Sequence, residues 1–389
     1  MDARSLPEAL KLIMQQRGWT QTQLAKELNT SQTWVSQITL GHKDTGIAKA
    51  ITLLARVDWE VVIRPKREGP VKRREFNTKI AQSAAGVILI PSAKTDAFQD
   101  PEYVHALADR AASTRHELGG HPVLPSLLGQ VRRTESAVHG TDQKLQAAAS
   151  RLAREAMLAL YDAQRYDEAE RIGQFSLALA RRAKDYPAQA TAYTILSQIN
   201  THQGIGDRGA VYAERALQLP DLSNANKAYV RIRLGRALSL VPGKERQART
   251  MLDQARSLDG IPAFEAADVA GNVAIALDRL HLHHEAHSTF DETVSRMGQW
   301  STLYRAQYLA HQTKAAVRAR ELSLAADLMH TFAAILPFLA SARTHSLAQE
   351  ILSTSAAWAN VREVRDARQQ LQAAVSSMPS PRSTKPTSA

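Results

Sequence analysis

Residues 20–41 read Thr20-Gln-Thr-Gln-Leu-Ala-Lys-Glu-Leu-Asn-Thr-Ser-Gln-Thr-Trp-Val-Ser-Gln-Ile-Thr-Leu-Gly41. This stretch predicts two short helices joined by a tight turn. Thr20 and Ser31 stand where each helix would begin, and a hydroxyl at that position accepts a free backbone N–H. Asn29 stands at the turn, because asparagine tolerates a positive φ better than other non-glycine residues. The predicted inward-facing positions are Leu24, Ala25, Leu28, Val35 and Ile38.

A further helix is predicted on each side of this pair, and Gly18 can end the preceding one in the left-handed conformation. Their apolar positions are Leu6, Leu10, Ile13 and Met14 before the pair and Ile47, Ile51 and Leu54 after it. Glutamines cluster at the start of the second helix of the pair. This layout is typical of a helix-turn-helix unit, whose second helix enters the major groove of DNA.

Residues 6–55 resemble the XRE family, the helix-turn-helix fold of lambdoid phage repressors and many bacterial regulators. The stretch Gly18-Trp-Thr-Gln…Leu24-Ala25…Ser31-Gln32…Val35-Ser36-Gln37-Ile38…Gly41 follows the family pattern without a gap. The family usually has glycine where this chain has Asn29, and asparagine serves the same backbone need.

The resemblance implies a DNA-reading surface on the second helix. The base-reading candidates are Gln32, Thr33, Ser36 and Gln37. The amide of Gln32 can donate and accept together, which matches the N6 and N7 pattern of adenine. The candidates for phosphate and sugar contacts are Gln21, Lys43 and Trp34, although Trp34 has packing against the fold as its alternative. We expect a homodimer on a double-stranded operator, because one such unit contacts only one half-site.

Composition agrees with an intracellular DNA-binding protein. The 389 residues suffice for two or more domains, and the absence of cysteine fits a reducing cytoplasm. No apolar stretch is long enough to span a bilayer, so no membrane partner is expected. Residues 1–80 carry 14 Lys/Arg against 8 Asp/Glu, whereas residues 81–378 carry 33 against 30. Over half of the net charge of +11 therefore lies in the small N-terminal part, as phosphate neutralisation requires.

The segment after the fourth helix is rich in β-branched and aromatic residues and stops at Pro65. We predict a short strand over residues 59–64. It has no evident local partner, and pairing with the same strand of a second subunit would satisfy it. A fifth helix or an ordered linker is the alternative. Residues 66–99 are expected to form a linker that is basic at its start and apolar later, either lying on phosphates or solvated.

From about residue 143 to 378 the sequence repeats a small residue followed at +4 and +7 by further inward positions. The first residues of the six units are 40, 39, 38, 39 and 42 positions apart. The units start at Ala169, Gly209, Ala248, Ala286, Ala325 and Ala367. Together with Tyr166-Asp-Glu-Ala169, Leu234-Gly235 and Tyr193-x2-Leu196-Ser197, they resemble tetratricopeptide repeats with a longer period.

Such repeats stack into a superhelix with a concave surface that receives a peptide, a protein or another part of the chain. Gln198, Arg236 and Asn272, on the leading helices, are the candidate groove residues; a solvated helix face is the alternative for each.

Two histidine groups suggest a metal site only weakly. His116-Glu-Leu-Gly-Gly-His121 has the wrong spacing for a zinc-protease motif, and its glycines would break the helix. His283 and His287 are one turn apart, at a predicted turn between helices where solvated histidines are common. No nucleophile, phosphate-loop or paired-carboxylate pattern occurs. We therefore expect no enzyme activity, no metal and no cofactor.

The sequence predicts an all-α protein, with one added strand at most. The predicted parts are a helix-turn-helix domain (1–65), a linker (66–99), a tetratricopeptide-like array (100–378) and a disordered tail (379–389). The predicted function is a cytoplasmic transcription regulator whose array dimerises, senses a peptide or protein effector, or both. This arrangement resembles the peptide-sensing regulators called RRNPP. The alternatives are a DNA-tethered interaction adaptor and an antitoxin-like repressor that acts through a protein partner.

Overall fold

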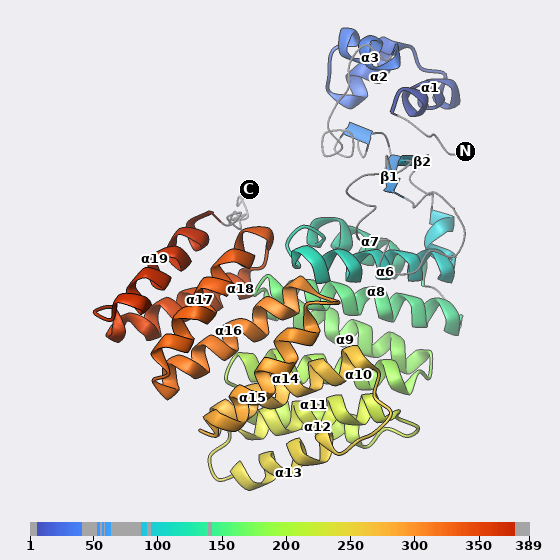
Figure 1. Ribbon diagram of the computed structural model, residues 1–389. Coiled ribbons are helices and arrows are strands. Elements are labelled where there is room, and N and C mark those ends of the chain that lie inside the picture. The colour runs from blue at the N-terminus through green and yellow to red at the C-terminus, as the bar shows by residue number, and fades with distance from the viewer. Residues whose placement is uncertain are drawn as a thin grey trace. The chain divides into compact units, whose positions relative to one another are not determined.

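The computed structural model describes residues 6–40, 53–54, 57, 59–63, 87–91, 95–138 and 142–377. The chain divides into two compact units, residues 1–97 and 98–389 (Figure 1). Each unit has its own core.

The first unit begins with α1 (Leu6–Arg17), α2 (Gln21–Leu28) and α3 (Gln32–Thr39). The predicted caps are confirmed. The Thr20 hydroxyl accepts from Gln23 N, and the Gln23 side chain accepts in turn from Thr20 N at 2.8 Å. Ser31 Oγ accepts from Trp34 N at 3.1 Å and so starts α3. Asn29 has φ 53° and ψ 53°, the left-handed turn that the sequence predicted.

One apolar core holds these helices together. Leu10, Ile13, Leu24 and Val35 are almost completely buried in it, with exposures of 0–1%. Trp59 is 2% exposed and belongs to the same cluster. Its burial fixes the start of the following strand to the helical core.

The predicted strand forms, but its partner is in the same chain. Strand β1 (Trp59–Ile63) pairs antiparallel with β2 (Val87–Pro91), with Trp59 opposite Pro91 and Ile63 opposite Val87. The expectation that β1 lacks a local partner is therefore wrong. The two alternative predictions for residues 59–64, a fifth helix and an ordered linker, are wrong as well. β2 shares the composition of β1, an apolar β-branched run that stops at proline. The segment predicted as linker thus supplies the second strand.

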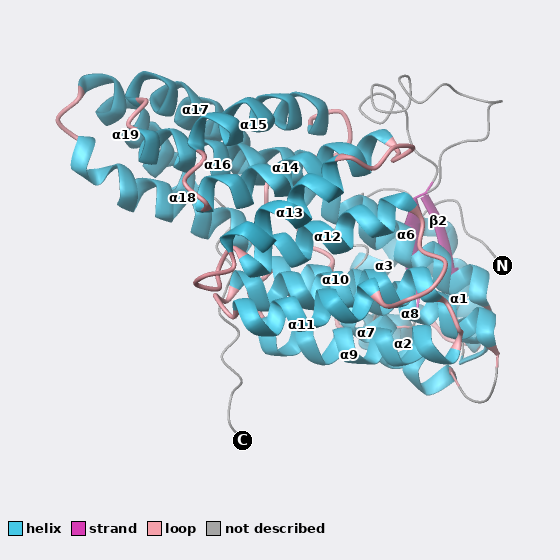
Figure 2. Cartoon of the chain, turned by 90° about the horizontal axis from the view of Figure 1, so that it is seen from below, coloured by secondary structure: helices cyan, strands magenta, loops and turns pink. Residues whose placement is uncertain are grey.

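In its described residues, the second unit contains helices and connecting loops but no strand (Figure 2). The short 3-10 turn η1 (Thr95–Gln99) spans the sequence boundary between the two units. The helices before the repeats are α6 (Pro101–Leu118) and α7 (Leu124–Ala137). The first helices of the hairpins are α8 (Gln143–Asp162), α10 (Tyr186–His202), α12 (Asn224–Leu238), α14 (Ala263–Arg279), α16 (Thr302–Ala319) and α18 (Ala342–Thr354). The second helices are α9 (Tyr166–Arg182), α11 (Gly206–Leu217), α13 (Glu245–Arg256), α15 (His283–Met297), α17 (Leu322–Ile335) and α19 (Arg362–Ser377). Two 3-10 turns, η2 (Leu336–Phe338) and η3 (Ser355–Trp358), complete the unit.

The repeat predicted from sequence coincides with the second helix of every hairpin. All three positions of each of the six units are buried. At Gly173, an added Cβ would lie 2.5 Å from the sulfur of Met157 on α8, so a small residue is required there. Consecutive hairpins then pack through their first helices, α10 on α12 and α12 on α14. The tetratricopeptide-like array is therefore confirmed.

The array closes on itself. Helix α16 packs on α6, and α18 packs on α8, although these helices are far apart in sequence (Figure 1). Backbone hydrogen bonds join the two ends: Ala340 N donates to Leu118 O at 2.7 Å, and His121 N donates to Ala340 O at 3.2 Å. Gly119 and Gly120 permit this contact. An added Cβ would lie 2.7 Å from the oxygen of Ala340 or Ala159, respectively.

Candidate functional site

The first candidate site is the exposed face of α3. At 3.6 residues per turn, Gln32, Thr33, Ser36 and Gln37 fall within an arc of about 140°. The opposite arc is buried and comprises Trp34, Val35, Ile38 and Thr39. Gln32, Thr33 and Gln37 are exposed and Ser36 is half-buried. The four predicted base-reading residues thus share one polar face.

The structure adds an interaction within this face. Gln32 Nε2 donates to Gln21 Oε1 at 3.1 Å, so the first residues of α2 and α3 are joined by their amides. Gln32 retains its Oε1 acceptor and one N–H donor, which is the pair that adenine N6 and N7 require. Gln21 uses only its Oε1 in this contact and retains both hydrogens of its Nε2. This pairing orients an amide that would otherwise rotate freely.

The other predicted DNA contacts have different positions. Trp34 is only 7% exposed and packs in the core of the first unit. The structure shows the second of its two predicted roles, packing against the fold. Little of the ring surface is exposed for contact with a sugar or phosphate. Lys43 lies outside the described residues.

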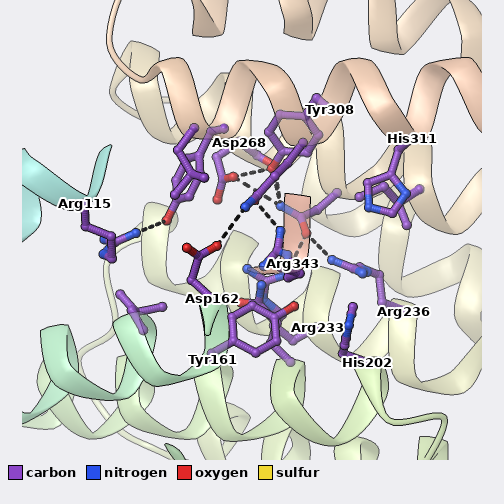
Figure 3. A pocket seen from close by; sticks show the side chains of 17 residues that line it. Arg115, Tyr161, Asp162, His202, Arg233, Arg236, Asp268, Tyr308, His311 and Arg343 are labelled. Atoms are coloured by element: carbon purple, nitrogen blue, oxygen red, sulfur yellow. Dashed lines mark hydrogen bonds between the residues drawn. The ribbon is translucent and has the colours of Figure 1, made fainter. Parts of the chain in front are cut away.

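The second candidate site is a polar cavity inside the array. An inner chamber of about 50 Å³ adjoins an outer chamber of about 320 Å³. Every residue that lines the inner chamber belongs to α6 or to the first helix of a hairpin (Figure 3). The two chambers share the lining residues Arg115, Leu158, Gln198, Arg233, Asp268 and Tyr304.

Asn272 is at the centre of the hydrogen bonds in the inner chamber. Its Oδ1 accepts from the guanidinium of Arg233 at 2.6 Å and also from that of Arg236. Its Nδ2 donates to the hydroxyl of Tyr308 at 2.7 Å. The Tyr308 hydroxyl in turn donates to a carboxylate oxygen of Asp268. The amide thus connects two arginines on α12 with the polar residues of α14 and α16.

Other charged groups of the cavity are paired at its margins. Arg115 donates to Glu155 and to the hydroxyl of Tyr304, both at 3.2 Å. Burial alone would raise the pKa of Glu155, but Arg115 and Arg154 lower it below its ordinary value. Asp162 accepts from Gly120 N and Ser341 Oγ, both at 2.7 Å, where the array closes.

The interior carries an excess of positive charge. Burial, with Arg279 and Arg233 nearby, lowers the pKa of Arg236 to about 9. Burial, followed by Arg343 and Arg236, lowers the pKa of His202 to about 3. His202 is therefore neutral at pH 7, and the positive charge of the cavity comes from its arginines.

All three predicted groove residues line the inner chamber. Arg236 and Asn272 are 6% and 3% exposed, so a solvated helix face does not describe them. Tyr308 and Arg343 belong to the same set but did not emerge from the sequence analysis. A signal existed: Gln198, Arg236 and Asn272 are 38 and 36 residues apart, and further steps of 36 and 35 reach Tyr308 and Arg343. These residues occupy successive first helices.

The histidine groups have structural neighbours. The ring of His116 stacks on Phe264 and lies tilted against Tyr304, with ring centroids 5.6 Å and 5.0 Å apart. His283 Nδ1 lies 3.0 Å from Asp278 Oδ1, and His287 Nε2 lies 3.4 Å from Asp291 Oδ2. Within the described ranges, no group of three or more potential metal ligands occurs. No helix in the described part of the chain is long and apolar enough to cross a membrane.

Comparison with known families identifies the first unit. The helix-turn-helix family model matches residues 10–56. No curated protein matches the chain. The chain therefore combines a helix-turn-helix domain, of the class found in DNA-binding transcription regulators, with a tetratricopeptide-like array.

Two solved structures are similar to the chain at low sequence identity. One is a Rap protein in complex with competence and sporulation factor: the identity is 10%, 71% of this chain and 98% of that chain are covered, and the TM-score is 0.41. The other is Bacillus thuringiensis PlcR in complex with the peptide PapR7 and DNA: the identity is 13%, the coverages are 95% and 99%, and the TM-score is 0.36. At these values, neither structure assigns a role to a residue of this chain.

Proposed function

We propose that this protein is a sequence-specific transcription regulator. It binds operator DNA as a homodimer through α3, and its array dimerises the protein, senses a peptide or protein effector, or both. The observation that carries the DNA-binding part is the amide pair of Gln21 and Gln32. It presents an oriented donor and acceptor at the first turn of the helix that enters the major groove.

The cavity supports the sensing part. Its outer chamber of about 320 Å³ is within the range of ligand pockets and is lined by both apolar and polar side chains. The apolar walls include Ile195 and Phe264, and the polar groups include Gln198 and Arg233. The first helices of all six hairpins contribute to the inner chamber together with α6, so a ligand there would contact most of the array at once.

Genome-wide mapping of the DNA bound by the full-length protein tests the proposal. One shared sequence at the bound sites, read by the purified protein with salt-dependent affinity, is the expected result. Adding a cell extract fraction of small molecules and peptides should then change operator affinity. An adaptor that is merely tethered to DNA predicts the same mapping result but an operator affinity that no small ligand or peptide alters. Uniform binding across the genome would contradict the proposal.

A further inference from the structure

Among the described residues, Arg233 and Arg236 are two buried arginines that form no ion pair with a carboxylate. Their side chains are 7% and 6% exposed, and both guanidiniums donate to one neutral acceptor, Asn272 Oδ1. The Nε of each arginine is buried and has no hydrogen-bond partner among the described residues. Arginine cannot relieve this cost by losing its proton at neutral pH. Burying two guanidiniums that share one amide oxygen costs desolvation and repulsion energy, and no carboxylate in the described part of the chain offsets this cost.

The two carboxylates of the inner chamber, Asp268 and Asp162, do not fill this need. Asp268 accepts from Tyr308 and lies 3.3 Å from the amide nitrogen of Asn272. Asp162 is bound by Gly120, Gln307 and Ser341. Among the described ion pairs, none joins either carboxylate to Arg233 or Arg236. Both carboxylates of the inner chamber therefore already have their own donors.

Other cations gather around the same place. Arg343 lies against the ring of Tyr161, 4.6 Å from its centroid, and donates to the neutral side chain of Gln307. Figure 3 shows Arg233, Arg236 and Arg343 in the same part of the cavity. Guanidiniums bind carboxylate and phosphate oxygens strongly because their N–H groups match these anions in geometry.

The dimensions of the two chambers restrict the ligand. The inner chamber of about 50 Å³ has room for a group of a few heavy atoms, whereas the outer chamber of about 320 Å³ has room for a larger body. Arg233 lines both chambers. A ligand with a small charged head and a less polar body fits this arrangement.

We infer that the inner chamber is an anion-binding site, in which Arg233 and Arg236 hold the carboxylate or phosphoryl head of an effector whose body occupies the outer chamber. Asn272 positions the two guanidiniums, and Tyr308 with Asp268 holds Asn272. The inference rests on the proposed effector role of the array and adds the chemical class of the effector.

Thermal unfolding of the full-length protein with simple probes tests the site. The probes are sodium phosphate and N-acetyl-leucine, with N-acetyl-leucinamide and sodium chloride at equal ionic strength as uncharged and ionic controls. At ten times the Kd, an anion that binds the site should raise Tm by about 2–4 °C. A response to phosphate alone identifies a phosphoryl head, and a response to N-acetyl-leucine but not to its amide identifies a carboxylate.

Arg236→Gln and Arg233→Gln should each weaken anion binding by about tenfold or more, because a charged hydrogen bond is lost. In dilute chloride, both variants should melt at or above the wild-type Tm, since an uncompensated buried charge has been removed. Arg249→Gln is the matched control. It removes the same charge from an ion pair with Glu285 on the outer helices and should keep the wild-type response.

No Tm response of the wild type to either anion, or an equal response in both variants, would overturn the inference. The inference would also be overturned if both variants melted well below the wild type and anions had no effect on any of the proteins, because the arginines would then be structural. Operator affinity is measured in parallel. Anion binding that leaves operator affinity unchanged supports the anion site and contradicts the sensing role of the array. The experiment therefore distinguishes failure of the anion site from failure of the proposed sensing function.

Discussion

Gln21 and Gln32 lie eleven residues apart and meet because a left-handed residue, Asn29, turns the chain between α2 and α3. The hydrogen bond between their side-chain amides has a chemical consequence. Gln21 withdraws one donor of Gln32 and leaves one donor and one acceptor on the exposed side. The sequence alone supplied the two glutamines and their face, but not the contact that orients them.

Gln32→Ala should cost about 1–3 kcal/mol of operator binding and relax the base preference at one position per half-site. Gln21→Ala should weaken binding as well, and the double variant should lose less than the sum of the two, because the amides act as a pair. Lys43→Ala should instead weaken all duplexes alike and lower the salt slope by about one unit. Titrations on operator and scrambled duplexes at several salt concentrations measure both effects.

Gln16→Ala, at an exposed position near the end of α1, is the control for the loss of one amide. If Gln32→Ala lowered affinity equally for operator and scrambled duplexes, the assignment of base reading to α3 would be wrong.

His202 makes the stability of the array depend on pH. Its pKa in the folded protein is about 3, below the ordinary value of 6.5, because of burial and then of the nearby arginines. As the pH falls, the unfolded chain therefore takes up the proton before the folded protein does. The contribution of neutral His202 to the free energy of unfolding is present above pH 6.5 and is lost as the pH falls towards 3. His202→Phe, which keeps a ring beside Tyr161, should reduce the loss of stability between pH 7 and pH 5 by about 1–2 kcal/mol.

Urea unfolding of both proteins at the two pH values provides the measurement. His284, whose side chain is 97% exposed, supplies the control variant His284→Gln. An equal decrease for the wild type and His202→Phe would show that His202 is not the group responsible.

At the scale of elements, two glycines give opposite predictions. In Gly120→Ala, the new Cβ would lie 2.7 Å from the backbone oxygen of Ala159 on α8, so the variant should lose about 1–3 kcal/mol of stability. Gly129 lies within α7 and has no atom within 4 Å of an added Cβ, so Gly129→Ala should gain about 0.5–1 kcal/mol. Equal changes of Tm in the two variants would contradict the close packing described at the closure.

The elements differ in how far the sequence determined them. The small residues at Ala169 and its equivalents mark a local need, close approach within one hairpin, and such a need is visible in a repeat. The pairing of β1 with β2 joins segments separated by a long connection, and nothing in either strand specifies its partner. The closure of the array depends on Gly119-Gly120 and on Ala340, more than 200 residues apart. Single-sequence patterns carry no signal for such contacts.

The burial of the groove residues also could not be predicted from the sequence. A polar side chain on a leading helix looks the same whether the superhelix is open or closed. Arg236 and Asn272 become buried because α16 and α18 return to α6 and α8 and cover the concave side. The same closure brings Tyr308 and Arg343 into the cavity, so the full set could be recognised only with the fold at hand.

At the scale of the whole molecule, we expect a homodimer at micromolar concentration, because one helix-turn-helix unit contacts only one half-site. β1 already has a partner in its own chain, which leaves the array as the main candidate for the dimer contact. Sedimentation velocity with and without operator DNA measures the assembly.

Removal of residues 100–389 should leave a domain that binds DNA more weakly and ignores any effector. A full-length monomer that stays monomeric on operator DNA would count heavily against dimer binding. A truncated domain with the affinity and regulation of the full protein would exclude both proposed roles of the array.

The closed array has a consequence for how the chain acquires its structure. An open solenoid can grow from one end, each repeat resting on the one before. Here α6 and α8 obtain their last neighbours only when Ala340 and Ser341 exist, about 180 to 220 residues later, which takes about 10–40 s at ordinary translation rates. Contacts of such long sequence separation slow folding and make it more cooperative. The helix-turn-helix domain, complete long before, therefore emerges from the ribosome well ahead of the structure that is proposed to control it.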